Sequence, residues 1–185
     1  VPYQESDGTW ARWCNAPGGR SVTIRPDGRE RRTSRVYMAI CNSDRKLEGI
    51  GVENQKAELH QLFGDIGWEV PRVLSDMDKC KDFYLQEIAQ VKMNKWSKGR
   101  VALVGDAAYC PSPISGMGTT AAIVGAYVLA GEIARHEDYN EAFVSYESLL
   151  RPFIAKAQTL VPGAPQIANP QTEWGITMLQ TALRV

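Results

Sequence analysis

One loop gathers the residues best suited to chemistry. Gly105 and Asp106 follow an apolar run over residues 101–104, and a loop rich in proline and glycine then leads to a helix that begins near Gly118. Ligands of open α/β sheets bind at the carboxyl ends of the strands, where Asp106 is expected. The helix directs unpaired N–H groups and the positive end of its dipole toward the loop. The spacing therefore predicts a site for an electron-rich or anionic group, with Asp106 as its carboxylate.

The flanking elements must hold this loop in place. Residues 101–104 show no polar alternation, which predicts a central strand buried on both faces. Pro111 and Pro113 exclude helix and sheet pairing up to Gly116. An ordinary buried strand and helix joined by a loop would give a similar pattern, so that structural interpretation stays open.

The loop resembles a known cofactor motif. The pattern G-D-A-A-x-x-x-x-P-x-x-G-x-G occurs here from Gly105 to Gly118, and it is similar to the second flavin motif of FAD-dependent aromatic-hydroxylase-type (class A) monooxygenases. The resemblance implies that Asp106 hydrogen-bonds the ribityl chain of FAD, and that residues 116–119 follow the pyrimidine edge of the flavin ring. The cofactor contacts that it implies, if FAD is bound, are Gly105, Asp106, Pro113, Gly116, Met117, Gly118 and Thr119.

The chain departs from this motif at two positions. Many family members carry Asn near position 120 and Asp near position 125, where this chain has Thr120 and Gly125. The run after Gly125 instead resembles the branch that contains antibiotic- and polyketide-modifying members. Segments before the motif, over residues 68–71, 82–84 and 90–100, look like the substrate-sheet region of the same branch.

The rest of the chain predicts both strands and helices. Short runs over residues 9–14, 20–24 and 34–41 favour an antiparallel meander, with a charged, solvated hairpin tip at residues 29–32. Residues 82–93 alternate and predict a strand with one face on the core and one lining a cavity. Helices are expected over four ranges, which are 54–63, 71–77, 140–160 and 173–183.

Together these elements predict an α+β fold. It consists of an antiparallel substrate-domain sheet plus the C-terminal strand–loop–helix part of a flavin-hydroxylase FAD domain, and it is truncated relative to that family. We expect a substrate-type β-rich region over residues 1–95. A remnant of the FAD domain is expected over residues 96–185, and the two are expected to form one compact unit.

The dinucleotide-binding motif of this family is missing. No stretch of the sequence has the G-x-G-x-x-G spacing between a strand and a helix that would hold the pyrophosphate of FAD. The remaining loop would contact only the ribityl chain and the ring. We therefore expect no cofactor on this chain alone, and FAD only if the missing half is supplied.

Three functions are compatible with the sequence. The first, which we favour at this stage, is a truncated relative that catalyses a non-redox step on a hydrophobic secondary-metabolite intermediate: isomerisation, epoxide opening or cyclisation. Buried carboxylates with pKa values raised by desolvation would act as acids there, and the candidate catalytic residues are Asp106, Glu87, Tyr109 and Tyr84. The second is part of an FAD- and NAD(P)H-dependent monooxygenase acting on an aromatic or polyketide-type substrate. The third is a non-catalytic binding module.

The composition of the chain limits the kinds of molecule that it is expected to bind. The 21 basic and 21 acidic residues balance, so no field favours nucleic acid, and the longest apolar window is too short to span a membrane. Four separated cysteines give no zinc pattern and suggest free thiols in the cytoplasm. We expect a hydrophobic small-molecule substrate and no metal. A homodimer or higher oligomer is also expected, with a sheet edge or the helix of the motif at its interface.

Overall fold

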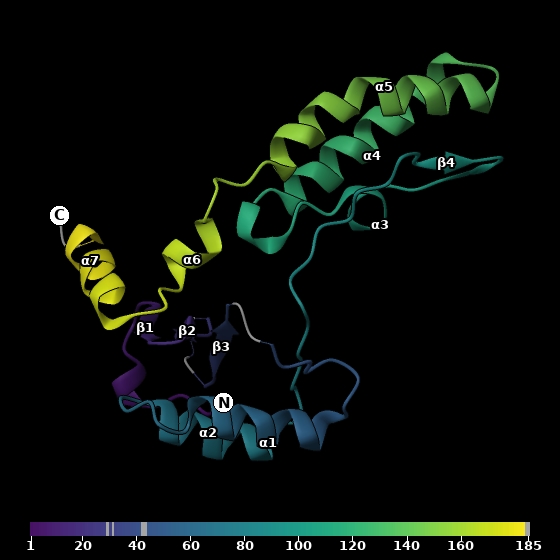
Figure 1. Ribbon diagram of the computed structural model, residues 1–185. Helices are drawn as coiled ribbons and strands as arrows, with labels where there is room; N and C mark the ends of the chain where they lie inside the picture. The colour runs from purple at the N-terminus through teal and green to yellow at the C-terminus, as the bar shows by residue number, and fades with distance from the viewer. Residues whose placement is uncertain (29, 31, 42–43, 184–185) are drawn as a thin grey trace. The chain divides into compact units, whose positions relative to one another are not determined.

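The computed structural model describes residues 1–28, 30, 32–41 and 44–183 (Figure 1). The chain divides into two compact units, one formed by Val1–Gln86 with Gly163–Val185 and the other by Glu87–Pro162. The boundary between the units lies nine residues before the predicted boundary between residues 95 and 96. The C-terminal segment belongs to the first unit, whereas the prediction grouped it with the FAD-domain remnant. The predicted boundary concerns where the FAD-domain remnant begins, and it stays a prediction.

The first unit is built on the predicted meander. Its strands are β1 (Arg12–Ala16), β2 (Arg20–Pro26) and β3 (Ser34–Ile40), paired antiparallel in that order. Two adjacent glycines at the β1–β2 turn have φ values of 83° and 69°, which L side chains rarely adopt. At the β2–β3 tip, Arg29 and Arg31 lie outside the described residues. Their neighbours Glu30 and Arg32 form an exposed ion pair 3.0 Å long.

Two helices pack against one face of this sheet. They are α1 (Val52–Phe63) and α2 (Val70–Lys79), which confirm the predicted helices with slightly longer bounds. Alternate residues of the strands supply the core on that face, because successive side chains of a strand point to opposite sides. The buried cluster includes Val22, Ile24, Phe63, Val70 and Val73.

The opposite face of the sheet carries aromatic and polar side chains. Trp13, Thr23 and Tyr37 are directly opposite one another across the three strands, and both aromatic side chains are about half exposed. The unit is completed by η1 (Glu5–Asp7), α6 (Ala164–Ala168) and α7 (Glu173–Leu183). The C-terminal segment is tied to the sheet by the Ser21 hydroxyl, which donates to the Asn169 side chain at 2.6 Å.

Residues 82–93 do not form the predicted strand. Their alternation is real over a short stretch, since Phe83 and Leu85 pack against the first core while Tyr84 and Gln86 are exposed. A strand also needs a neighbour for its backbone groups. Within the part of the chain that the structure describes, no strand pairs with this segment, so it runs as an unpaired connection.

The second unit is a pair of long helices with a hairpin and the motif loop. Helix α4 (Gly118–Arg135) packs along α5 (Tyr139–Gln158), and both confirm the predicted helices. The shorter elements are β4 (Ser97–Lys98), β5 (Val101–Ala102), α3 (Asp106–Tyr109) and η2 (Pro113–Ser115). Three aromatic rings lie at the centre of this unit's core: the ring of Trp96 lies 4.7 Å from that of Tyr109 and 5.7 Å from that of Tyr146.

The prediction of a central strand buried on both faces at residues 101–104 is wrong for the described residues. Only Val101 and Ala102 pair, with β4, and the side chain of Val101 is 61% exposed. Leu103 and Val104 do pack against the second core. An apolar run becomes a central strand only between two neighbours, and here β4 is its one neighbour among the residues described.

The packing of the second unit requires glycine at position 125. A Cβ placed on Gly125 would lie 1.8 Å from the hydroxyl oxygen of Tyr109 and 3.0 Å from a methyl group of Leu150. Helix α4 can therefore approach α3 and α5 closely only where it has no side chain. Position 125 is one of the two places where the sequence departs from the flavin motif that it resembles.

Gly125→Ala should destabilise the protein by about 1–3 kcal/mol, because the added methyl group overpacks the core. Removing the hydroxyl as well, in Gly125→Ala with Tyr109→Phe, should recover part of that loss. Gly131→Ala is the matched control in the same helix, where a Cβ meets nothing within 4 Å, and it should stabilise by about 0.5–1 kcal/mol. Urea unfolding followed by circular dichroism measures all three. Equal effects at positions 125 and 131 would contradict this account of the packing.

Candidate flavin-binding loop

The motif loop is held in an unusual backbone conformation. Gly105, at the start of α3, and Gly116, at the end of η2, have φ values of 68° and 66°. Between them Ser112 has a φ of 78°, which is rare for a residue with a side chain. Its buried hydroxyl accepts a hydrogen bond from the Ile114 N–H at 3.2 Å. Such conformations persist only where the surroundings fix them, and they are common at ligand sites.

Asp106 lies beside the first turn of α4. A Cβ placed on Gly118 would be 3.9 Å from the Oδ1 atom of Asp106, and a Cβ placed on Gly105 would be 3.3 Å from that of Ala122. The first three N–H groups of a helix have no partner within it, while the Ala121 N–H already bonds the Met117 carbonyl. An exposed carboxylate acceptor therefore lies close to the start of α4, where the helix leaves N–H donors without a partner of its own.

Two glutamine side chains hold the loop from behind. The Nε2 atom of Gln158, at the end of α5, lies 2.7 Å from the carbonyl oxygen of Val91, 3.2 Å from that of Tyr109 and 3.3 Å from that of Cys110. The two amide hydrogens thus serve three acceptors. Gln90 donates to the Pro111 carbonyl at 3.0 Å. We call Gln90 and Gln158 the amide clamp.

Sequence reasoning did not identify the amide clamp. Gln90 stands within a segment quoted for its family resemblance, and Gln158 ends an amphipathic helix. A glutamine in either setting is unremarkable. Only the folded chain brings the two amides to the carbonyl groups of residues 109–111.

The predicted catalytic residue Tyr109 lies in the core. It is 1% exposed, and its hydroxyl is 3.2 Å from that of Tyr146. Tyr146 donates its single proton to the Leu103 carbonyl at 3.0 Å, so Tyr109 is the donor between the two hydroxyls. Burial, with the hydrogen bond to Tyr109, raises the pKa of Tyr146 above its ordinary value. The Tyr109 hydroxyl therefore holds α3 against α5.

The other two candidates are exposed residues that belong to different units of the chain. Tyr84 belongs to the first unit, is 78% exposed, and donates to the Gln86 side chain at 2.8 Å. Glu87 belongs to the second unit and is exposed. The expectation of buried carboxylates is therefore wrong, because Asp106 and Glu87 both face solvent. The catalytic roles of the four residues stay predictions.

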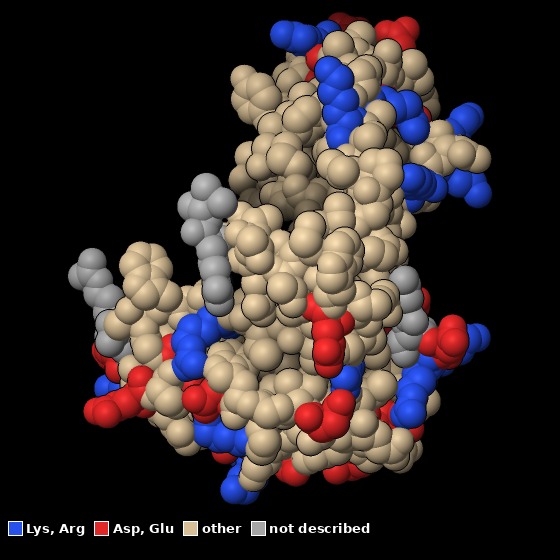
Figure 2. Space-filling view, turned by 60° about the vertical axis from the view of Figure 1, so that its left-hand side comes forward, with Lys and Arg blue, Asp and Glu red and all other residues tan. Residues whose placement is uncertain are grey.

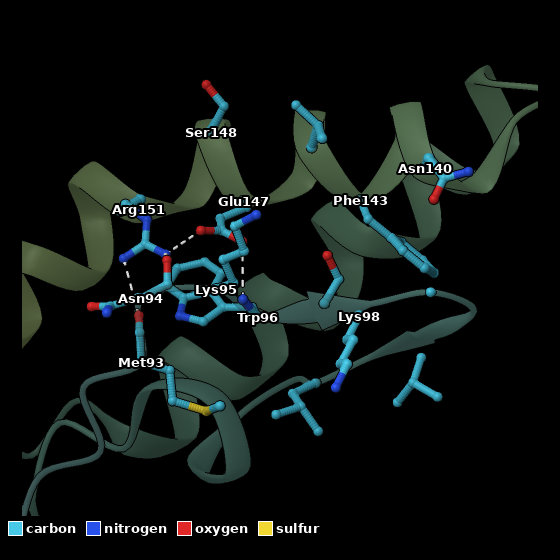
Figure 3. Close-up of a pocket in the computed structure, with 15 residues that line it drawn as sticks. Met93, Asn94, Lys95, Trp96, Lys98, Asn140, Phe143, Glu147, Ser148 and Arg151 are labelled. Atoms are coloured by element: carbon cyan, nitrogen blue, oxygen red, sulfur yellow. Dashed lines mark hydrogen bonds and ion pairs between the residues drawn. The ribbon is translucent and has the colours of Figure 1, made fainter.

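A groove of about 960 Å³ runs between the β4–β5 hairpin and α5 (Figure 3). The Trp96 N–H donates to Glu147 at 3.0 Å, and Glu147 also pairs with Arg151, whose guanidinium carbon lies 4.6 Å from the Trp96 ring centroid. Burial acts to raise the pKa of Glu147. The Trp96 hydrogen bond and the charges of Arg151 and Lys95 outweigh it and hold this pKa below its ordinary value. These groups satisfy one another and fix the hairpin on α5.

The donors and acceptors of the loop fit one end of FAD. The carboxylate of Asp106 can accept hydrogen bonds from the ribityl hydroxyls, and the free N–H groups of α4 can donate to the carbonyl oxygens of the flavin ring. Gly116, where a Cβ would meet nothing within 4 Å, leaves the loop open to a ligand. The sequence contains no G-x-G-x-x-G turn for the pyrophosphate.

This loop and fold define part of an FAD-binding domain. A sequence model described as "FAD binding domain" matches residues 2–159, and the chain belongs to this family, in the FAD-dependent aromatic-hydroxylase-type group of flavoprotein monooxygenases. The predicted α+β fold class is likewise confirmed.

Two fungal relatives have similar sequences. The chain is 41% identical to the FAD-dependent monooxygenase asL6 of Sarocladium schorii over 157 residues, which is 84% of this chain and 37% of that protein. It is 38% identical to the monooxygenase CTB7 of Cercospora beticola over 182 residues, 92% of this chain and 43% of that protein.

Solved structures agree on the fold. The tetracycline destructase Tet(55) superposes with a TM-score of 0.72 at 34% identity, over 91% of this chain and 45% of that one. Klebsiella pneumoniae HpxO complexed with FAD and uric acid has a TM-score of 0.65 at 21% identity, over the whole of this chain and 46% of that one, and supports the fold alone. The chain thus spans less than half the length of each relative named.

The described residues show neither a metal site nor a membrane-spanning helix. They contain no group of three or more His, Cys, Asp or Glu side chains placed to hold a metal ion. No helix among them has the length and apolar character needed to cross a membrane.

Gln158→Ala should loosen the motif loop. Losing a donor shared by three carbonyl groups should cost about 1–3 kcal/mol of unfolding free energy and speed amide hydrogen exchange over residues 105–118. Gln180→Ala, an exposed glutamine of α7, is the control and should change neither quantity. Unchanged exchange in the loop of the Gln158 variant would show that the clamp does not hold it.

Stability should fall in acid partly through Glu147. Its pKa is lowered in the folded state, so its contribution is present above the unfolded pKa of about 4.3 and is lost as pH falls through the lower folded value. Glu147→Gln should therefore be less stable than the unmodified protein at pH 6. The difference in unfolding free energy should shrink as the pH falls from 4.5 to 3, because Glu147 becomes protonated in this range. Glu137→Gln, at an exposed site, is the control. Urea titrations at fixed pH test this, and a pH-independent difference would contradict it.

Proposed function

We propose that this chain supplies the flavin-ring and substrate side of an FAD- and NAD(P)H-dependent monooxygenase. The observation that carries the proposal is the position of Asp106, exposed beside the free N–H groups of α4 in a strained loop. Membership of the FAD binding domain family supports it. The names of the two fungal relatives also support it, since asL6 is called an FAD-dependent monooxygenase and CTB7 a monooxygenase.

In this proposal the chain holds one end of the cofactor. Bound FAD would supply the redox chemistry of a monooxygenase. Asp106 accepts hydrogen bonds from the ribityl hydroxyls, and the first turn of α4, including Thr119, donates to the ring. Gly105, Pro113, Gly116, Met117 and Gly118 shape the surrounding backbone. The amide clamp keeps these groups in place while ligands come and go.

The aromatic face of the sheet in the first unit is the proposed substrate side. Trp13 and Tyr37 are exposed and flank Thr23, and the Arg25 guanidinium carbon lies 6.0 Å from the Tyr37 ring centroid. Flat rings stack well on such side chains, and the hydroxyl of Thr23 adds a polar contact. This surface supports an aromatic or polyketide-type hydrophobic substrate.

The non-redox function, with acid catalysis in an old substrate cavity, is the second candidate. It needs a buried acid, because desolvation is what would make a carboxylate a good proton donor at neutral pH. The exposure of Asp106 and Glu87 gives it less support than the flavin function. The third candidate is a non-catalytic binding module. It would be favoured if the chain neither binds FAD nor catalyses a reaction.

The surface supports a small-molecule partner over nucleic acid. Figure 2 shows positive and negative side chains mixed on one face with broad uncharged areas between them, in keeping with the equal numbers of acidic and basic residues. A phosphate backbone attracts proteins with a concentrated basic surface. Cytoplasmic location and self-association stay predictions.

Flavin titrations test the proposal. Because the chain contacts only the ring and ribityl end, FAD, FMN and riboflavin should quench its tryptophan fluorescence with similar affinities within about threefold, in the micromolar range or weaker. Asp106→Ala should weaken all three by about tenfold, the equivalent of one charge-assisted hydrogen bond. Asp44→Ala in the first unit, remote in sequence from the motif, is the control.

The same experiment separates the alternatives. Nanomolar FAD with strong discrimination against riboflavin would mean that the chain also holds the ADP end. No flavin binding, together with conversion of an epoxide substrate without NADPH that Asp106→Asn abolishes, would support the acid-catalysis candidate and reject the monooxygenase proposal.

A further inference from the structure

The four charged residues of helix α5 serve different sides of the helix. Glu147 and Arg151 form an ion pair beside the hairpin, where Glu147 also accepts a hydrogen bond from the Trp96 N–H. The other two, Glu141 and Lys156, are exposed near opposite ends of the helix. They lie about 60° apart around the helix axis, because an α-helix turns by about 100° per residue. Glu141 and Lys156 therefore face the same side.

An exposed stripe without charge joins these two residues. Helix positions three, four or seven apart lie on one side of a helix. Figure 3 shows Ser148, near the middle of this side, pointing away from the hairpin. Every exposed residue of α5 between positions 141 and 156 belongs to this side. We call the set the outer stripe of α5, and its members are Glu141, Val144, Ser148, Leu149, Pro152, Ala155 and Lys156.

The outer stripe has an unusual composition for the solvent side of a helix. Such a side normally carries charged and polar residues. Between the two charged ends of this stripe, however, Ser148 is the single polar residue, and Val144 and Leu149 are 70% and 58% exposed. A hollow of about 580 Å³ lies along the first half of the stripe, so the surface has room for side chains of a partner. The residues that line this hollow are His136, Asn140, Glu141, Val144, Ser145, Ser148 and Leu149.

Pro152 leaves a backbone acceptor without its helical donor at the middle of the stripe. Proline has no N–H, so Pro152 cannot donate to the carbonyl group four residues earlier in the helix, which belongs to Ser148. The Ser148 hydroxyl is a donor on the same residue. A second Ser148 placed opposite would satisfy both groups reciprocally, hydroxyl to carbonyl. This position therefore favours a partner that has the same residue there.

The two ends of the stripe carry opposite charges. The side chain of Glu141 is 70% exposed, and its ion pair with His136 is long, at 3.5 Å. The Lys156 side chain forms no hydrogen bond or ion pair with any residue that the structure describes. In a two-fold dimer each contact occurs twice, with the partners exchanged. An axis between Ser148 and Leu149 lies midway between the two charged residues along the chain. Antiparallel helices related by this axis therefore bring each Glu141 beside Lys156 of the partner subunit.

We propose that the outer stripe of α5 is the interface of an antiparallel homodimer, in which α5 packs against α5 of a second copy of this chain. The stripe is complementary to itself, since its acidic end meets its basic end, whereas a parallel pair would place like charges together. Burial of Val144 and Leu149 adds apolar contact area. This interface differs from the sheet edge and the helix of the motif that the sequence suggested. It is independent of the proposed function, and its test needs no flavin.

Sedimentation velocity of the full chain tests the charge pattern. Because a contact between two helices is small, the unmodified protein should dimerise with a micromolar dissociation constant. Glu141→Lys and Lys156→Glu should each weaken the dimer by about fivefold, because each replaces attractive contacts by repulsive ones at both symmetric positions. The double variant that carries both substitutions should restore the dimer to within about twofold of the unmodified protein.

A central substitution and a matched control locate the interface. Ser148→Arg places two positive charges at the two-fold axis and should weaken the dimer by about tenfold or more. Lys81→Glu makes the same charge reversal as Lys156→Glu at an exposed site in the first unit, and it should leave the dimer unchanged. Far-UV circular dichroism verifies that every variant keeps its helices.

Four results would overturn the proposal. They are a monomer at every concentration up to about 200 µM, equal weakening of the dimer by the Lys81→Glu control, a dimer that Ser148→Arg leaves intact, and a double variant that stays as weak as the single ones. The third would assign self-association to another surface, such as the sheet edge. The fourth would reject the antiparallel orientation. A failed flavin titration would reject the proposed function and leave this inference standing.

Discussion

The packing of the second unit depends on the Tyr109 hydroxyl, which occupies the space that a side chain at position 125 would fill. Any side chain at position 125 would occupy the position of that hydroxyl. With glycine there, Tyr109 reaches Tyr146, and Tyr146 reaches the Leu103 carbonyl just before the motif. One line of hydrogen bonds therefore joins α5 to both ends of the segment that carries Gly105 and Asp106. Buried hydroxyls need such partners, since an unpaired one costs free energy.

This packing explains how an exposed loop can keep a defined shape. The side of the loop that faces the protein is held by Tyr109 in the core and by the amide clamp on the carbonyl groups of residues 109–111. The opposite side leaves Asp106 and the start of α4 free for a ligand. Rigid support behind an open surface is the usual arrangement of a binding site, because a ligand then need not order the loop.

Two exposed surfaces of the chain differ in composition. On the sheet of the first unit, Trp13 and Tyr37 are interleaved with Thr23 and Arg25, a mixture suited to a small molecule with rings and polar groups. On α4, the exposed residues between positions 123 and 134 are aliphatic apart from Tyr127. A surface with so few polar groups offers a small ligand little specificity.

The sequence by itself determined the family, the motif and most of the elements. The order of Gly105, Asp106, Pro113, Gly116 and Gly118 was sufficient because such a loop needs specific residue types at fixed spacing. The helices and the three-stranded meander followed from periodicity and turn residues, which act locally. What depended on distant partners did not follow. Residues 101–104 and 82–93 both have strand patterns. Within the described residues, however, the first lacks a second neighbouring strand and the second lacks any.

Only the tertiary structure decided the surroundings of the candidate residues. It buried Tyr109, exposed Asp106 and Glu87, and placed Tyr84 in the other unit. It also revealed the amide clamp, because the role of a glutamine depends on which carbonyl groups the fold brings to it. Burial and hydrogen bonding are properties of the assembled chain, whereas motif spacing and periodicity are already present in the sequence.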